Sequence, residues 1–172
     1  MVKSSAFKAV VVGCAVLGGA ASAMAQTKAQ GLSFHVGQFF PQSALARDWE
    51  GGRWFLAGID YDVTGKYNFF GQSMGTSISA DIYSKGSFTA VPIMINGTQR
   101  NGRTFMGLGA GVSFIHRKDD QGMSFAETQL GYTFFFGIDL QTSEHPLFLQ
   151  AKYYGNSRPD LAGFGVSIGT RF

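Results

Sequence analysis

The sequence predicts an all-β fold, an eight-stranded antiparallel up-and-down transmembrane β-barrel, and three observations support this prediction. Apolar residues alternate with small or polar ones along most of the chain, with the period of two that is typical of strands. Turn residues interrupt this alternation at regular intervals. One face of the extended segments carries no Asp, Glu, Lys or Arg, which favours contact with lipid.

The composition indicates one ordered domain. Of the 172 residues, 45% are apolar, 15% are aromatic and only 15% are charged. Disordered chains have low hydrophobicity and coiled coils are rich in Ala, Glu, Lys and Leu, so both classes are excluded. If Lys3 and Lys8 near the start of the chain are left out, the sequence has 12 basic and 11 acidic residues. This nearly neutral balance predicts no nucleic-acid partner, and the single Cys excludes a disulfide framework.

A secretory signal peptide is predicted for residues 1–25, so that export leaves a domain of residues 26–172. Two lysines form a basic start, residues 9–20 are apolar, and residues 23–25 have the Ala-x-Ala pattern of a cleavage site. The apolar stretch is too short for a transmembrane helix, which needs about 20 residues. A lipoprotein signal ending at Cys14 is the weaker alternative, because it would leave an apolar stretch of only about four residues.

The domain divides into eight predicted strands, most of them about ten residues long, which is the length that a tilted strand needs to cross the hydrocarbon. Turns are predicted at 41–51, Thr64-Gly65, Asn96-Gly97 and Asn101-Gly102 among other sites. Residues 65–73 are the least certain stretch: they either extend the third strand or form an interfacial aromatic turn. The predicted strands cover residues 31–40, 52–63, 74–83, 88–96, 103–117, 124–138, 147–154 and 161–172.

Side chains alternate across a strand, so each strand can be sorted into two faces. The apolar face, which includes Phe34, Ile59 and Leu108, is expected to contact acyl chains. Charge is absent there because an Arg or Lys at mid-bilayer costs about 2–4 kcal/mol on a barrel. Aromatic residues near the strand ends are expected to form interfacial girdles: Phe39, Phe40, Trp49, Trp54, Phe69, Phe70, Tyr153 and Tyr154.

The opposite face is rich in Gly and Ser, with a few charges of both signs, and is expected to line a narrow, packed polar interior. A soluble sandwich or lipocalin-like domain is the alternative, because it also has one apolar face. The polar face is interpreted as an internal salt-bridge and hydrogen-bond network, with a narrow ion or proton path or a gate as the functional alternative. The predicted lumen network consists of His35, Asp60, Asp62, Asp81, Arg117, Glu127, Lys152 and Arg171.

The last predicted strand alternates apolar residues with Gly, Ser and Arg and ends on an aromatic residue. This pattern resembles the C-terminal β-signal of bacterial outer-membrane proteins. The mature chain resembles the OmpA/OmpX-like superfamily of small eight-stranded outer-membrane barrels. The resemblance implies the barrel fold, outer-membrane localisation and recognition of the last strand by the assembly machinery, but it implies no active site. The residues that carry the signal are Phe164, Val166, Ile168 and Phe172.

Two families of small outer-membrane barrels are enzymes, and the chain lacks a close match to the catalytic residues of either family. In the lipid A 3-O-deacylases a late strand carries His-x-Ser-Asn, whereas residues 153–156 here read Tyr-Tyr-Gly-Asn and lack the base and the nucleophile. The palmitoyltransferase barrels use His, Asp and Ser near the outer rim, and His116 with Asp119, Asp120 and Ser124 is only a loose analogue. We therefore expect no enzyme activity, no cofactor and no metal site.

The expected function is that of a monomeric outer-membrane protein with a structural or surface-interaction role in the cell envelope. Outer-membrane lipids and the assembly machinery are its expected partners. An eight-stranded lumen is just wide enough for side chains to fill it, so free diffusion of solutes is not expected. The alternatives are a narrow channel or small-molecule transport barrel and, second, a lipid-modifying enzyme.

Overall fold

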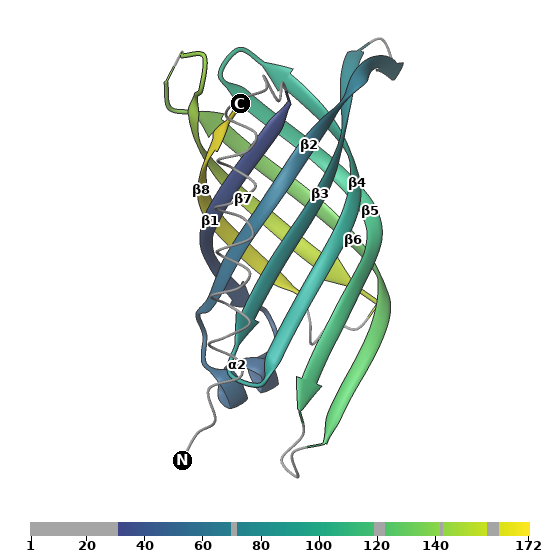
Figure 1. Cartoon of the computed structure of the whole chain (residues 1–172), viewed down its shortest axis with the longest axis vertical. Helices are drawn as coiled ribbons and strands as arrows, with labels where there is room; N and C mark the ends of the chain where they lie inside the picture. Colours follow the sequence, from purple (N-terminus) through teal and green to yellow (C-terminus); the bar gives the residue numbers. More distant parts are fainter. Residues whose placement is uncertain (1–30, 70–71, 119–122, 142, 158–161) are drawn as a thin grey trace. The chain divides into compact units, whose positions relative to one another are not determined.

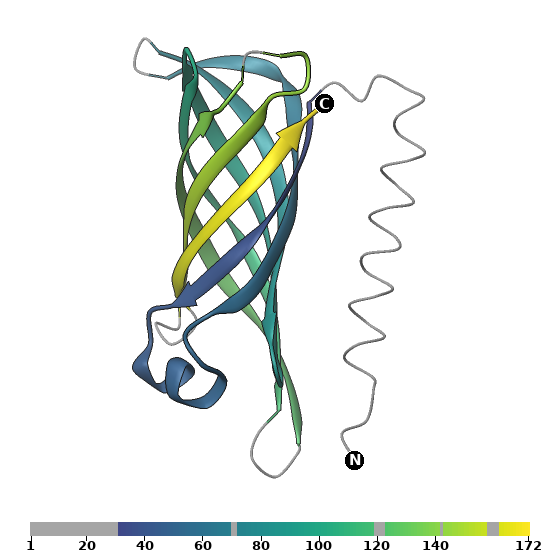
Figure 2. The same cartoon turned by 90° about the vertical axis from the view of Figure 1, so that its left-hand side faces the viewer.

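The structure is a computed structural model that describes residues 31–69, 72–118, 123–141, 143–157 and 162–172. In this part of the chain eight antiparallel strands form a closed barrel, because the first strand pairs with both the second and the eighth. Figures 1 and 2 show the tilted strands around the wall and a short helix at one end. The elements are β1 Leu32–Pro41, α2 Ala44–Glu50, β2 Trp54–Phe69, β3 Gln72–Lys85, β4 Phe88–Asn101, β5 Thr104–Lys118, β6 Ser124–Asp139, β7 Leu147–Asn156 and β8 Gly163–Arg171.

The prediction of an all-β, eight-stranded antiparallel barrel with up-and-down topology is confirmed. β5 and β6 begin and end within one residue of their predicted bounds. β2 and β4 extend furthest beyond their predicted ends, since β2 continues to Phe69 instead of ending at 63 and β4 continues to Asn101 instead of 96. No helix in the described part of the chain is long and apolar enough to span a membrane.

The predicted turns at Thr64-Gly65 and Asn96-Gly97 are wrong. β2 passes through the first site with an irregularity in its pairing between Val63 and Lys66, where the longer strand accommodates extra residues as a bulge. Asn96 lies inside the barrel, where its Nδ2 atom donates a hydrogen bond to Ser79. Pairing with the neighbouring strands therefore overrides the local turn preference at both sites.

A short helix, α2, occupies part of the loop predicted at 41–51 and is absent from the prediction. The Ser43 hydroxyl caps its start by accepting a hydrogen bond from the Ala46 N–H. The helix ends at Gly51, whose φ of +80° favours glycine, and the Gly51 N–H donates to the Arg47 carbonyl over 2.8 Å. The helix closes over one end of the barrel, where Ala46 packs against the buried core.

The outward face of the barrel is apolar on every strand. Its largest exposed fractions are 74% for Leu130, 64% for Ile95 and 63% for Leu108. Among the outward strand positions whose side chains are described, none carries Asp, Glu, Lys or Arg. The apolar face predicted by parity is therefore the outer surface of the barrel, and the polar face lines its interior.

The assignment of three aromatic residues to the interfacial girdles is wrong, because their side chains point inward and add large rings to the polar inner face. Phe39, Trp54 and Tyr154, which the sequence predicts in the girdles, are almost completely buried inside the barrel. They share the inward parity of their strands, so the alternation places them in the interior. Phe40 does face outward, and Tyr153 lies on the same outer face beside Phe164. Of the remaining girdle residues, Trp49 lies in α2, Phe69 ends β2, and Phe70 is outside the described residues.

Candidate functional site

Three layers fill the barrel interior along its axis. At the α2 end lies an aromatic and aliphatic cluster, which we call the plug. The middle holds a group of buried polar side chains, the polar layer, made of His35, Ser79, Asp81, Asn96, Thr133 and Lys152. At the opposite end, where β1 begins and β8 ends, a small cavity opens, which we call the cup. The plug consists of Phe39, Trp54, Leu56, Tyr83, Phe88, Ala90, Ile115 and Tyr154.

Stacked rings close the interior at the plug. The Phe39 and Tyr83 rings stack with centroids 4.1 Å apart, and the Tyr154 ring lies 5.3 Å from Tyr83. Trp54 and Phe88 extend the cluster with centroids 4.7 Å apart. Each of these five side chains is at most 7% exposed, and ring pairs at such distances stabilise one another beyond the area they bury. The plug therefore fills the lumen with apolar atoms.

A buried ion pair forms the centre of the polar layer. The Lys152 ammonium donates a hydrogen bond of 2.7 Å to Asp81 Oδ2, and these two side chains are 2% and 0% exposed. The ammonium also lies 3.3 Å from the Ser79 hydroxyl. Asn96 extends the network, because it donates to Ser79 over 3.0 Å and accepts from Thr133 over 3.1 Å. Charges this deeply buried are tolerated only because they are paired and hydrogen-bonded.

His35 connects the polar layer to the cup. Its Nε2 atom lies 2.8 Å from Asp81 Oδ1, a hydrogen-bond distance. Its Nδ1 atom lies 3.3 Å from Asp60 Oδ2, within ion-pair distance but without hydrogen-bond geometry. Both ring nitrogens therefore face carboxylates, and only the doubly protonated imidazolium offers a proton to both.

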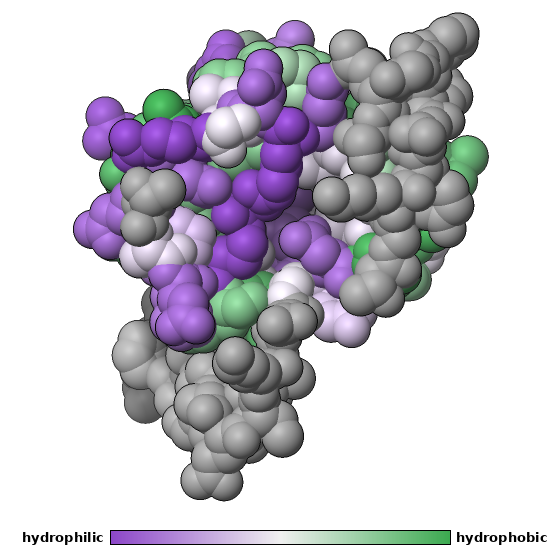
Figure 3. Space-filling model, turned by 90° about the horizontal axis from the view of Figure 1, so that it is seen from above, coloured by the Kyte–Doolittle hydropathy of each residue, from purple (hydrophilic) through white to green (hydrophobic). Residues whose placement is uncertain are grey.

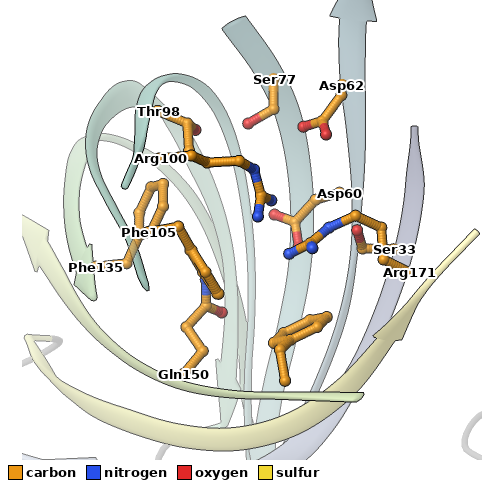
Figure 4. A pocket seen from close by; sticks show the side chains of 11 residues that line it. Ser33, Asp60, Asp62, Ser77, Thr98, Arg100, Phe105, Phe135, Gln150 and Arg171 are labelled. Carbon is orange, nitrogen blue, oxygen red and sulfur yellow. The ribbon is translucent and has the colours of Figure 1, made fainter. Parts of the chain in front are cut away.

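The cup has a volume of about 30 Å³ and is lined by four charged side chains together with uncharged polar side chains and three Phe rings. Figure 3 looks at the barrel from this end and shows hydrophilic residues gathered there. Arg100 and Arg171 reach into the cup from opposite sides, with Asp60 between them (Figure 4). The Asp139 carboxylate forms ion pairs with both guanidinium groups, with oxygens 3.4 Å from Arg100 Nη1 and 3.2 Å from Arg171 Nη1. Both groups also lie over the Phe105 ring, 5.0 and 5.4 Å from its centroid.

The predicted lumen network divides into three places in the structure. Four of its members, His35, Asp60, Asp81 and Lys152, meet where the polar layer joins the cup. Asp62 and Arg171 line the cup itself. Arg117 and Glu127 form a separate, partly exposed pair 3.3 Å apart on the strands β5 and β6.

Sequence reasoning missed Arg100 and Asp139 because they lie just beyond the predicted ends of their strands. Continuing the alternation past those ends would have found them: Arg100 has the parity of Asn96, and Asp139 that of Gly137.

The described groups offer little for catalysis. Ser79 lies beside Lys152, but Asp81 holds the ammonium in its charged form, so Lys152 is a poor base for the hydroxyl. His116 is exposed on β5, while Asp119 and Asp120 lie outside the described residues. Within the described ranges no group of three or more His, Cys, Asp and Glu residues is placed to hold a metal ion. The absence of an enzyme activity stays a prediction.

Gly58 allows His35 and Asp81 to meet across β2. An added Cβ at this position would overlap Asp81 Oδ1 and the His35 ring. We expect Gly58→Ala to lower the free energy of unfolding by about 1–3 kcal/mol in urea titrations of the reconstituted barrel. Gly75→Ala is the matched control, because the nearest atom to its added Cβ, the Thr98 carbonyl oxygen, is 3.8 Å away. Equal losses for both variants would contradict the role of Gly58.

Comparison of the chain with protein-family models, with curated proteins and with solved structures found no match.

Proposed function

We propose that the protein is an integral outer-membrane β-barrel with a closed interior and a structural or surface-interaction role in the cell envelope. The observation that carries this proposal is the exposed apolar outer face, which continues around all eight strands. Monomeric soluble proteins rarely expose apolar patches larger than a few hundred Å². Each strand contributes an outward side chain that is at least 44% exposed: Val36, Tyr61, Ile78, Ile95, Leu108, Phe134, Leu149 and Ile168.

Export and assembly belong to the same proposal. Residues 1–25 would direct secretion, and the β8 strand would carry the signal for the outer-membrane assembly machinery. Three residues of this signal, Phe164, Val166 and Ile168, are exposed on the outer face, where another protein or lipid can contact them. The architecture, a closed barrel of eight antiparallel strands, is consistent with an OmpA/OmpX-like fold.

Cell fractionation tests the location directly. We expect the protein to sediment with outer-membrane markers, to need detergent for purification and to show a heat-modifiable shift in gels. A protein that purifies without detergent and binds an apolar ligand would contradict the proposal and favour a soluble lipocalin-like binder.

The ordered loop at the plug end supports a surface-interaction role. Glu50 of α2 accepts hydrogen bonds from the backbone N–H and the hydroxyl of Ser87 in the neighbouring turn. Lys85 donates to the Arg53 carbonyl over 3.0 Å, and Arg47 donates to the Gln42 carbonyl over 2.7 Å. These bonds hold α2 in one position over the barrel end, so that it presents a defined surface to a partner outside the membrane.

An arginine introduced on the outer face shows whether that face contacts lipid or water, because the stability cost differs between the two. In lipid we expect Leu108→Arg to lower the free energy of unfolding by up to about 2–4 kcal/mol, because a guanidinium at mid-bilayer is costly. At a water-exposed position the same change usually alters stability by less than about 0.5 kcal/mol. Urea unfolding in lipid vesicles measures the difference, with Leu45→Arg on the exposed side of α2 as the control. Equal, small effects at both positions would argue against lipid contact.

A further inference from the structure

His35 lies between two carboxylates that differ in their access to solvent. The Asp60 side chain lines the cup and is 17% exposed, whereas the Asp81 side chain is fully buried. The imidazole touches both, at 3.3 Å through Nδ1 and 2.8 Å through Nε2. Asp60, His35 and Asp81 therefore lie one after another, each in contact with the next, between the cup and the Lys152 ammonium.

This series has an open end and a closed end. On the cup side it begins at Asp60, beside a cavity that is large enough for water. Beyond Asp81 and Lys152 lies the plug, whose Tyr154 ring is 5.4 Å from the Lys152 ammonium. Because the plug is packed with rings, water reaches the polar layer more readily through the cup than from the α2 end.

Charged groups face His35 from the strands packed around it. Asp60 approaches from β2 and Asp81 from β3, with Lys152 of β7 behind Asp81. Arg171 of β8 lies in the cup beside Asp60, and the uncharged Phe148 ring of β7 is 6.5 Å from the imidazole. Among the described side chains of the polar layer and the cup end, four carboxylates lie with three basic groups, so a protonated His35 would bring their net charge to zero. The carboxylates are Asp60, Asp62, Asp81 and Asp139, and the cations are Arg100, Arg171 and Lys152.

We propose that Asp60 and His35 form a proton-transfer site that serves the cup side of the barrel only. When the 3.3 Å contact between Nδ1 and Asp60 Oδ2 closes to a hydrogen bond, the imidazolium passes the Nδ1 proton to Asp60 Oδ2, which leaves a neutral imidazole and a neutral carboxylic acid. Asp60 then passes this proton to water in the cup and becomes a carboxylate again. The imidazole keeps its Nε2–H and donates it to Asp81 throughout. Proton uptake reverses these steps, so the net charge of the interior changes by one.

The site would make the charge of the barrel interior follow the pH of a single compartment. This consequence rests on the proposed function, because a barrel that does not cross a membrane has no separate compartments at its two ends. The proton transfer itself depends only on the contacts of His35.

The rate at which His35 gains and loses its proton tests the site. We would measure it by NMR relaxation dispersion on the ¹³C-labelled imidazole of the barrel in lipid nanodiscs, at the titration midpoint of each variant. Asp60→Asn is expected to slow the exchange by at least about tenfold, because a positioned acid–base group is lost. Asp62→Asn is the matched control for the loss of one carboxylate, since Asp62 lines the same cup from the same face of β2 and the described ion pairs of His35 are with Asp60 and Asp81. Its exchange rate should stay near that of the wild type.

One further variant keeps the test decisive. Asp60→Glu retains a carboxylate and should retain most of the exchange rate. Equal rates for Asp60→Asn and Asp62→Asn in a lipid-embedded barrel would overturn the proton-transfer site alone. A barrel that folds in water without lipid would overturn the proposed function. The exchange rates of His35 would still test the proton-transfer site, because that site depends only on the contacts of His35.

Discussion

Replacing Lys152 with Met is expected to lower the free energy of unfolding by about 3–5 kcal/mol, because it leaves a buried carboxylate without its cation. Asp81 is fully buried and takes its shortest hydrogen bond, 2.7 Å, from Lys152. Without the ammonium, His35 is the one basic side chain still in contact with Asp81 among the described residues. Urea or guanidinium titration of the protein in detergent micelles or vesicles measures the loss.

Arg117→Met is the control for the Lys152 variant. Arg117 also pairs with a carboxylate, Glu127, but the two side chains are 33% and 27% exposed. Water screens a pair of this kind, so we expect its loss to cost less than about 1 kcal/mol. Losses of similar size for the two variants would show that burial does not increase the contribution of the Asp81–Lys152 pair to the free energy of unfolding.

Opening the plug is expected to convert a closed barrel into one that conducts ions. Phe39 and Tyr154 are 0% and 1% exposed, and their rings meet at a centroid distance of 5.8 Å. Changing both to Ala removes two rings from the lumen and should produce current steps in planar bilayers where the wild type gives none.

Phe39→Ala alone is expected to lower the free energy of unfolding by about 3–5 kcal/mol, because it leaves a cavity in a packed core.

An outward-facing phenylalanine provides the control for the plug variants. Phe134 is 58% exposed on the outer face, so Phe134→Ala removes the same ring without touching the lumen. It should give no conductance, and its structural integrity can be checked by the same heat-modifiable gel shift. Conductance in the wild type would contradict the closed interior and favour the narrow-channel alternative. A folded double variant that remains silent would show that the polar layer also blocks ions.

The alternation of side chains correctly predicted that four ionisable residues of the interior point inward. His35, Asp60, Asp81 and Lys152 were all assigned to the inner face, and they lie there. This assignment needs only the period of two, because a strand places successive side chains on opposite sides whatever its neighbours are. The apolar outer face follows from the same rule.

The aromatic plug shows where reasoning by residue type failed. Phe39, Trp54 and Tyr154 were expected in interfacial girdles because they are aromatic and close to strand ends. Their parity is inward, however, and the space inside the barrel near α2 is large enough to hold them. Parity was the stronger signal, and applying it strictly would have placed these residues in the interior.

The contacts within the interior could not be derived from alternation. Asp81 and Lys152 are 71 residues apart, and their meeting depends on the register of every strand pair between β3 and β7. A shift of one residue in any pair would turn an entire strand over. Local patterns therefore determined the class of fold and the two faces of its wall. Closure of the barrel decided which charges pair, where rings close the lumen and which carboxylate stays open to water, because these contacts join residues that only the complete register brings together.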